Sequence, residues 1–232
     1  MKDEVDIYDI QQKLIAGFGL NSFGSYEAVW DMLRDIRLLK YVRRNQLSGI
    51  NKRYEKTCSD IKIARLIELG LLKKTENDIL ISTAKSLQLL KQFGKNTKTY
   101  PKNSEGEGSI NELNNTTVFI QALKLPDFFT LLYKDFGYIF PDALLVRGTR
   151  ERYKLEFLEV EASKSNWHDW LENKRINYLK LAGDKRAYSY WKEQCELLDL
   201  PIPDIKDFKF SVSIVGKIKK DFGEGFRFVE QL

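Results

Sequence analysis

Three acidic residues in the second half of the chain have the type and spacing of a site for a hard metal ion. Asp142 lies in FPDALLV, Glu159 in FLEVE follows it by seventeen residues, and Glu161 follows two residues later. If these segments form an antiparallel hairpin whose turn centres on either side of Thr149, Asp142 and Glu159 share one face of the sheet. Glu161 joins them, because residues two apart in a strand point the same way.

Clustered carboxylates repel each other when ionised, and a bound divalent cation relieves that repulsion. Oxygen ligands without histidine or cysteine suit Mg²⁺ or Mn²⁺. Such an ion can polarise a phosphodiester and lower the pKa of a bound water. The single histidine, His168, excludes multi-histidine metal sites. The two cysteines, Cys58 and Cys195, are far apart and indicate reduced buried thiols rather than a zinc finger.

A lysine is predicted to face the same site from a helix. Lys174 and Tyr178 are four residues apart, on the helix face that also carries Trp170 and Leu171. A lysine on a stripe that faces the sheet could support chemistry at the carboxylates. Lys164, just after the second acidic strand, is a second candidate for this position.

Structural explanations compete with each of these assignments. Glu159 and Glu161 could form the solvated face of an edge strand, and Asp142 after a proline could shape a β-bulge. Lys174 could be an ordinary surface lysine. His168 is expected to be a polar residue in the first turn of its helix, and the four tryptophans are expected in the core rather than as base-stacking platforms.

The elements that must position these residues form an α/β domain with a mixed sheet. Period-two alternation in RYKLEFLEVE predicts a strand, and apolar residues recurring every three or four positions predict helices. The predicted order is helix 111–124, strands 129–134, 138–147 and 152–161, helices 166–182 and 184–198, and strands 208–215 and 226–229.

The first part of the chain reads as helices closed by a hairpin. Helices are predicted at 26–40, 44–50 and 54–69, a hairpin at 71–82 and a closing helix at 83–93. That order is typical of a winged helix-turn-helix. The segment GKNTKTYPKNSEGEGS has almost no apolar residue and predicts a linker. We therefore expect a winged-helix domain at 1–93, a flexible linker at 94–109 and a second domain at 110–232, α+β overall.

Positive charge is concentrated where a winged helix meets DNA. The chain has 38 Lys and Arg against 33 Asp and Glu, and residues 40–74 hold ten of those bases against three acids. Double-stranded DNA is therefore the expected partner. A winged helix that makes only protein contacts is the alternative. The candidate phosphate contacts are Lys52, Arg53, Lys56, Lys62, Arg65, Lys73 and Lys74.

The ordered motifs carry a resemblance to known families. FPDALLV, FLEVE and the order of helix, three strands, helix and strand resemble the PD-(D/E)XK nuclease superfamily. The winged helix followed by NELNNTTVFIQAL, PDALLV, FLEVEAS and Lys174 with Tyr178 resembles the replication-relaxation family of phages and mobile elements. The resemblance covers most of residues 27–216.

The resemblance implies roles for individual residues. Asp142 and Glu159 would be metal ligands, and Glu112 matches an optional acidic position on the first helix. Glu161 stands where the superfamily usually has the lysine that orients or activates the attacking water. Some active restriction endonucleases of the superfamily also have Glu-x-Glu, and Lys174 could compensate from its helix.

Two functions follow as the main expectations. One is a Mg²⁺- or Mn²⁺-dependent DNA endonuclease or nickase of a phage or mobile element, for which a homodimer is expected if both strands are cut. The other is a DNA-binding protein that does not cleave and acts in replication, plasmid relaxation or transcription control. A purely regulatory winged-helix protein with an unrelated dimerisation domain is a third. The acidic N-terminus and the short apolar runs predict a cytoplasmic protein with no membrane segment.

Overall fold

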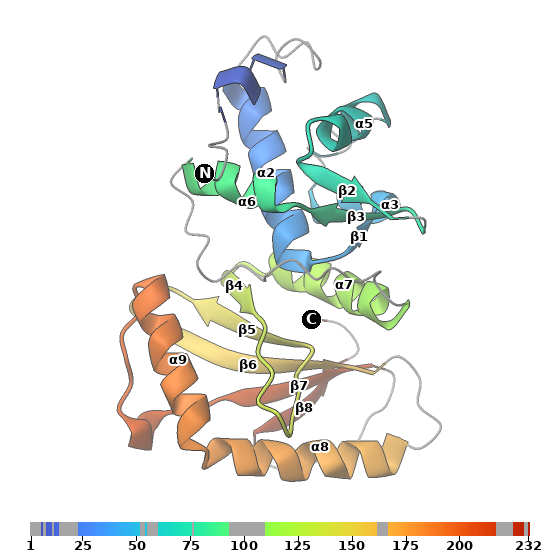
Figure 1. The fold of residues 1–232 in the computed structure, drawn as a ribbon. Coiled ribbons are helices and arrows are strands. Elements are labelled where there is room, and N and C mark those ends of the chain that lie inside the picture. Colours follow the sequence, from blue (N-terminus) through green and yellow to red (C-terminus); the bar gives the residue numbers. More distant parts are fainter. Residues whose placement is uncertain are drawn as a thin grey trace. The chain divides into compact units, whose positions relative to one another are not determined.

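The protein is described by a computed structural model that mixes helices with two β-sheets, in agreement with the predicted α+β class (Figure 1). It describes residues 6, 8–10, 12–13, 23–51, 54, 60–75, 77–92, 110–161, 167–216, 225–229 and 232, with the backbone alone at 23–27, 110–114, 167, 228 and 229. The predicted linker at 94–109 lies outside these residues. No helix in the described ranges is long and apolar enough to cross a membrane.

The chain forms two compact units, Met1–Ile120 and Gln121–Leu232. The division falls inside helix α7 (Ile110–Leu123). Most of that helix therefore groups with the first unit, to which it is tied by the Thr116 hydroxyl, a donor to the Tyr41 carbonyl at 2.7 Å.

The first unit follows the predicted order of elements. It contains helices α2 (Phe23–Leu39), α3 (Arg44–Ile50), α5 (Asp60–Glu68) and α6 (Ala84–Gln92), and the hairpin of β2 (Leu72–Lys74) and β3 (Ile79–Ser82). Strand β1 (Val42–Arg43) was not predicted, because two residues are too short for an alternating pattern. It pairs antiparallel with β3 and gives a three-stranded sheet in the order β1-β3-β2.

Helix α2 provides much of the core of the first unit. Leu33 and Ile36 are fully buried on it. Asp35 is also buried. Its carboxylate accepts a hydrogen bond from the Tyr54 hydroxyl at 2.7 Å and forms an ion pair with Arg34 at 2.8 Å. Burial raises the pKa of Asp35, while Arg34 and Tyr54 counteract that rise.

The second unit is built on the mixed sheet that the sequence predicts. The strands are β4 (Phe128–Leu132), β5 (Ala143–Gly148), β6 (Tyr153–Val160), β7 (Ser211–Val215) and β8 (Phe226–Val229), side by side in that order. Pairing is antiparallel from β4 to β6 and parallel from β6 to β8. Helices α8 (Trp167–Ala182) and α9 (Lys185–Leu198) stand between β6 and β7 in the chain.

One face of this sheet packs against both helices. Val146, Phe157 and Ile214 share a buried cluster with Tyr178 of α8 and Trp191 of α9, and Figure 1 shows the two helices beside the sheet. The residues that alternate with these in each strand, such as Leu145 and Leu158, point to the other face of the sheet and are also buried. The sheet thus has no solvated face at its centre, and a polar side chain there needs partners.

The β5–β6 turn lies one residue later than predicted. Ala143 pairs with Leu158 and Gly148 with Tyr153, so the hairpin centres after Arg150 rather than next to Thr149. Gly148 has φ +115°, and a Cβ at this position would meet the Arg152 carbonyl. The shift of a whole residue at the centre leaves the facing of the strands unchanged, because the side-chain period is two.

Candidate active site

Asp142 lies on the face of the sheet that is covered by α8 and α9. Its backbone N–H donates to the Leu158 carbonyl at 3.1 Å, and its Oδ2 accepts from the Val160 N–H at 2.7 Å. Alternation from Leu144 and Val146, which pack in the helix-covered cluster, places Asp142 on the same face. Asp142 therefore holds the end of β6 in place beside Glu159, as the hairpin argument required.

Glu159 is a buried carboxylate with three hydrogen bonds. Its side chain is 2% exposed. Lys174 Nζ lies 2.6 Å from Oε1 and 2.7 Å from Oε2, and the Tyr178 hydroxyl donates to Oε1 at 2.7 Å. The interpretation of Glu159 as part of a solvated edge is wrong, since β6 is an interior strand with β5 and β7 on either side.

The spacing of Lys174 and Tyr178 explains why both reach one carboxylate. Four residues apart in α8, they lie one above the other on the face that meets the sheet. Lys174 also donates to the Phe140 carbonyl at 3.3 Å and lies 5.7 Å from the centre of the Trp170 ring. With 19% of its side chain exposed, Lys174 is not an ordinary surface lysine.

The surroundings of Glu159 favour the protonated form of its carboxyl more than water does. Burial raises the pKa of Glu159 to about 7; Lys174 opposes the rise, the negative charge of Asp142 adds to it, and the Tyr178 hydrogen bond opposes it. Burial and the neighbouring Glu159 hold the pKa of Tyr178 well above its usual value. Tyr178 is therefore a neutral donor at any physiological pH.

Glu161 lies just beyond the end of β6, close to the end of β7. Its N–H donates to the Val215 carbonyl at 2.9 Å. Its side chain lies against Gly216, the residue after Val215, so that a Cβ on Gly216 would be 2.7 Å from Glu161 Oε2 and 2.9 Å from Glu161 Cβ. Gly216 thus leaves the space that the Glu161 side chain occupies.

Of the three acids expected at the site, the structure brings Asp142 and Glu159 together. Asp142 and Glu159 interact electrostatically, whereas the described residues contain no group of three or more acidic, histidine or cysteine side chains arranged for a metal. Glu112 lies on α7, but its side chain is outside the described part of the structure, as is the whole of Lys164.

The donors at this site still fit a hard divalent ion. Mg²⁺ commonly takes one or two carboxylates and completes its shell with water and substrate phosphates. Asp142 and Glu159 supply such a pair of carboxylates. Asp142 and Glu159 would hold the ion, and Glu161 could add a ligand only by leaving its position over Gly216.

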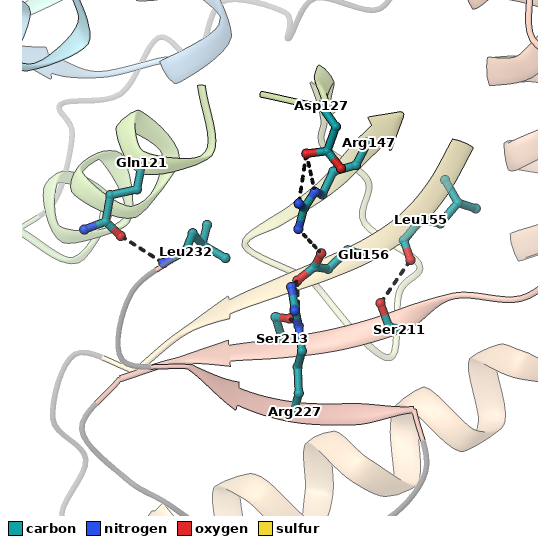
Figure 2. Close-up of polar contacts among 9 residues, drawn as sticks. All are labelled: Gln121, Asp127, Arg147, Leu155, Glu156, Ser211, Ser213, Arg227 and Leu232. Atoms are coloured by element: carbon teal, nitrogen blue, oxygen red, sulfur yellow. Dashed lines mark hydrogen bonds and ion pairs between the residues drawn. The ribbon is translucent and has the colours of Figure 1, made fainter. Parts of the chain in front are cut away.

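A second buried carboxylate on β6 was missed by the sequence argument. Glu156 lies on the opposite face from Glu159, between two arginines and a serine (Figure 2). Arg227 and Ser213 both donate to Oε1, and Arg147 Nη1 lies 3.5 Å from Oε2. Arg147 also pairs with Asp127 at 2.8 Å. Glu156 is two residues from Leu158 and shares its buried face, and this spacing is the sequence signal that the Glu156 carboxylate needs partners.

The predicted DNA-binding residues are only partly described. Lys52, Arg53 and Lys56 lie outside the described residues. Lys62 and Arg65 are partly buried on α5, and Lys73 and Lys74 are exposed on β2. Arg65 pairs with Glu68 at 2.8 Å, and Lys74 with Asp78 at 2.5 Å. Exposed pairs of this kind are weak, so phosphate oxygens could replace the acids.

The remaining polar and aromatic candidates behave as structural residues where they are described. His168 is exposed in the first turn of α8, and Cys195 is a buried free thiol; Cys58 lies outside the described residues. Trp30 and Trp191 are buried, as the core prediction required.

Comparison with protein-family models, curated proteins and solved structures gives no match for this chain, so its function must be inferred from the site itself.

Proposed function

We propose that the protein binds double-stranded DNA through its first unit and hydrolyses DNA phosphodiester bonds with Mg²⁺ or Mn²⁺ at the Asp142–Glu159–Lys174 site. The observation that carries the proposal is the buried Glu159, contacted by Lys174 and Tyr178 and within electrostatic reach of Asp142. In this proposal the first unit is a winged helix and the second a PD-(D/E)XK-like nuclease domain.

Each residue of the site has a separate role in the proposed hydrolysis. The bound ion would polarise the phosphodiester and lower the pKa of a water. Asp142 and Glu159 hold it, and Tyr178 fixes the Glu159 carboxylate by its hydrogen bond. Lys174, whose ammonium group is partly exposed, is placed to orient a water or to offset negative charge on the phosphate.

The central experiment is the conversion of supercoiled plasmid to nicked or linear DNA in Mg²⁺ or Mn²⁺. Asp142→Asn and Glu159→Gln should each lower the rate at least about a hundredfold, since such ions contribute several kcal/mol to the transition state. Glu172→Gln, an exposed change on α8, is the matched control and should keep the wild-type rate. Wild-type rates in both site variants would contradict the proposal.

Metal binding gives a readout that does not depend on cleavage. Titration of Mn²⁺ by calorimetry should show one site that is weakened in Asp142→Asn and unchanged in Glu172→Gln. Binding of equal strength in all three proteins would place the metal elsewhere.

DNA binding by the first unit is tested by its salt dependence. Lys73→Gln should weaken duplex binding and reduce the slope of affinity against salt concentration by about one ion, if Lys73 contacts one phosphate. Lys85→Gln on α6 is a control for the loss of one positive charge. An unchanged slope for Lys73→Gln would favour a winged helix that contacts protein.

One observation favours the alternative of a protein that binds DNA without cleaving it. Both carboxylate oxygens of Glu159 already accept hydrogen bonds, so the ion pair with Lys174 is complete without a metal. Salt-sensitive DNA binding together with no cleavage in any divalent ion would select this alternative and a role in replication, plasmid relaxation or transcription control.

A further inference from the structure

A large apolar side chain lies exposed beside the Glu159 site. Phe140 comes two residues before Asp142 in the chain and is 56% exposed. Its carbonyl oxygen accepts a hydrogen bond at 3.3 Å from Lys174 Nζ, the group that also contacts Glu159. A phenylalanine spans at most about 6.5 Å from its carbonyl oxygen to the centre of its ring, so the Phe140 ring lies within about 10 Å of the Lys174 ammonium.

The fold holds Phe140 in this exposed position. Its neighbours Ile139 and Pro141 are both buried, so the chain is anchored on either side of it. The Phe136 N–H donates to the Ile139 carbonyl at 3.1 Å, and the ring of Pro141 fixes its own φ. A side chain that is presented by a fixed backbone loses little freedom when it binds a ligand, which favours binding.

The surroundings of the Phe140 ring differ from those of the other rings nearby. Among the described residues it forms no stacking or cation–π contact, whereas the rings of Phe136 and Phe157 pack edge-on at 6.2 Å. Trp170, another ring close to Lys174, is partly buried and lies 5.7 Å from the ammonium nitrogen. The site therefore has one aromatic ring that supports the lysine and one that faces solvent.

The chemistry of a phenyl ring indicates what Phe140 can bind. The ring has no hydrogen-bond donor or acceptor, so it cannot bind the phosphate that Lys174 is placed to meet. It can pack against the face of a base, as aromatic side chains do when they bind single strands. One strand of B-form DNA advances about 3.4 Å per nucleotide, so the stacked base would lie within about three nucleotides of that phosphate.

An intact duplex hides the surface that Phe140 would contact. Each base face is covered by the next base, and an apolar side chain reaches it only where bases are unpaired or pushed apart. A lysine at a phosphate makes no such distinction, because the backbone carries the same charge in open and closed DNA. The ring thus adds a preference that the charged groups lack.

We propose that Phe140 stacks on an unpaired base of DNA, within about three nucleotides of the phosphate that Lys174 contacts. Phe140 is then a specificity-determining residue, and the DNA that the site prefers is a duplex opened locally. This inference rests on the proposed function and deepens it by naming the form of the DNA. Duplex binding by the first unit is compatible with it, since a bubble leaves the flanking DNA paired.

The test compares the affinities for a duplex with a central unpaired bubble and for the fully paired duplex. The full-length protein is titrated with each labelled DNA in Ca²⁺, a hard cation that takes carboxylate ligands as Mg²⁺ does, and binding is followed by fluorescence anisotropy. The wild type should bind the bubble roughly tenfold more tightly, because stacking adds to the phosphate contacts. Equal affinity for the two DNAs would overturn the proposal.

An abasic bubble separates stacking from flexibility. It has the same phosphates as the first bubble, but its unpaired segment carries no bases. The wild type should bind it no more tightly than the paired duplex. A preference that survives the loss of the bases would show that the protein responds to deformability of the DNA, and would overturn the proposal.

Variants assign the preference to the ring of Phe140. Phe140→Ala should abolish the bubble preference and leave the affinity for the paired duplex unchanged, whereas Phe140→Tyr keeps a ring and should keep the preference. Ile205→Ala, on the 3₁₀ helix η1 (Ile205–Asp207), removes a side chain of a residue that is also 56% exposed and should behave as the wild type. If Phe140→Ala fails to fold, Phe140→Leu removes the ring with a smaller change in volume. A full bubble preference in a folded variant without the ring would overturn the proposal.

The outcomes separate this inference from the proposed nuclease. Metal-dependent plasmid cleavage, with a bubble preference that Phe140→Ala does not change, would overturn the inference alone. A bubble preference that Phe140→Ala abolishes, without cleavage in any divalent ion, would support the inference and reject the nuclease. Absence of binding to every DNA would overturn both.

Discussion

Two buried glutamates on the same strand differ in the charge that surrounds them. Glu156 lies between two arginines, one of which also binds Asp127, so the two acids and two bases of that cluster cancel. Glu159, three residues later on the other face, has one lysine and one neutral tyrosine as hydrogen-bond partners, and the negative charge of the nearby Asp142 helps to raise its pKa. Glu156 is therefore held among fixed positive charges, whereas the ionisation of Glu159 changes near neutral pH.

The partners differ in chemistry as well as in number. A guanidinium stays charged at every accessible pH and binds a carboxylate in fixed geometry. At Glu159 the lysine bridges both carboxylate oxygens, and the tyrosine donates a single hydrogen bond to one of them. The comparison teaches that burial alone does not identify a reactive acid; the two glutamates are distinguished by their partners, which are guanidinium groups at Glu156 and an amine with a hydroxyl at Glu159.

The largest expected effect is in the pH dependence of stability. The pKa of Glu159 rises from an ordinary 4.5 to about 7 on folding. The folded state therefore holds an extra proton between these values, and stability should fall by up to about 3 kcal/mol as the pH rises from 4.5 to 7. In Glu159→Gln this fall should disappear, as measured by urea unfolding at several pH values. A variant with the same slope as the wild type would show that Glu159 titrates normally.

Removal of Glu156 should lower the stability of the protein without removing the pH dependence that Glu159 causes. Glu156→Ala removes the acidic partner of Arg227, which keeps its hydrogen bond to Ser213, and one contact of Arg147. It should cost about 3 kcal/mol, at the low end for buried pairs because Arg227 is half exposed. Urea unfolding at pH 7 measures the loss. Plasmid cleavage per folded molecule should be retained, so loss of cleavage in a well-folded Glu156→Ala protein would remove the distinction between the clusters.

A methyl group at Gly216 tests whether Glu161 belongs with Glu159. Gly216→Ala places a Cβ within 2.9 Å of Glu161 Cβ, which must shift. We expect a loss of about 1–2 kcal/mol in stability from overpacking and a change in Mn²⁺ affinity. Gly183→Ala, where a Cβ would meet nothing closer than 3.9 Å, is the control. Unchanged Mn²⁺ affinity would exclude Glu161 from the metal site.

The smallest effect is expected from the tyrosine hydroxyl. Tyr178→Phe removes one hydrogen bond to Glu159 and should cost about 1 kcal/mol. Because that bond lowers the pKa of Glu159, its loss should move the pH midpoint of cleavage upward. A midpoint that stays in place would show that the Tyr178 hydrogen bond does not influence the ionisation of Glu159.

Local patterns account for most of what the sequence predicts correctly. The facing of Asp142 and Glu159 follows from strand parity, which is insensitive to an error of one whole residue at the centre of the turn. The contact of Lys174 and Tyr178 with Glu159 follows from helical spacing once α8 is placed against the sheet.

Long-range partners account for what the sequence argument missed. Arg227 meets Glu156 across 71 residues, and no local pattern connects them. A cavity of about 540 Å³ beside Trp191 is lined by β6, α9 and the segment 201–210, so its shape depends on packing rather than on spacing. Strand β1 is defined by its hydrogen bonds with β3, since its two residues hold no periodicity.

The bond between Arg227 and Glu156 also has a consequence for synthesis of the chain on the ribosome. Glu156 is synthesised 71 residues before Arg227, so during translation its carboxylate lacks this partner until β8 has been made. Domains generally fold as units as they emerge. The five-stranded sheet of the second unit therefore cannot be completed before β8 has left the ribosome, although the strands and helices that carry Glu159, Lys174 and Tyr178 are made earlier.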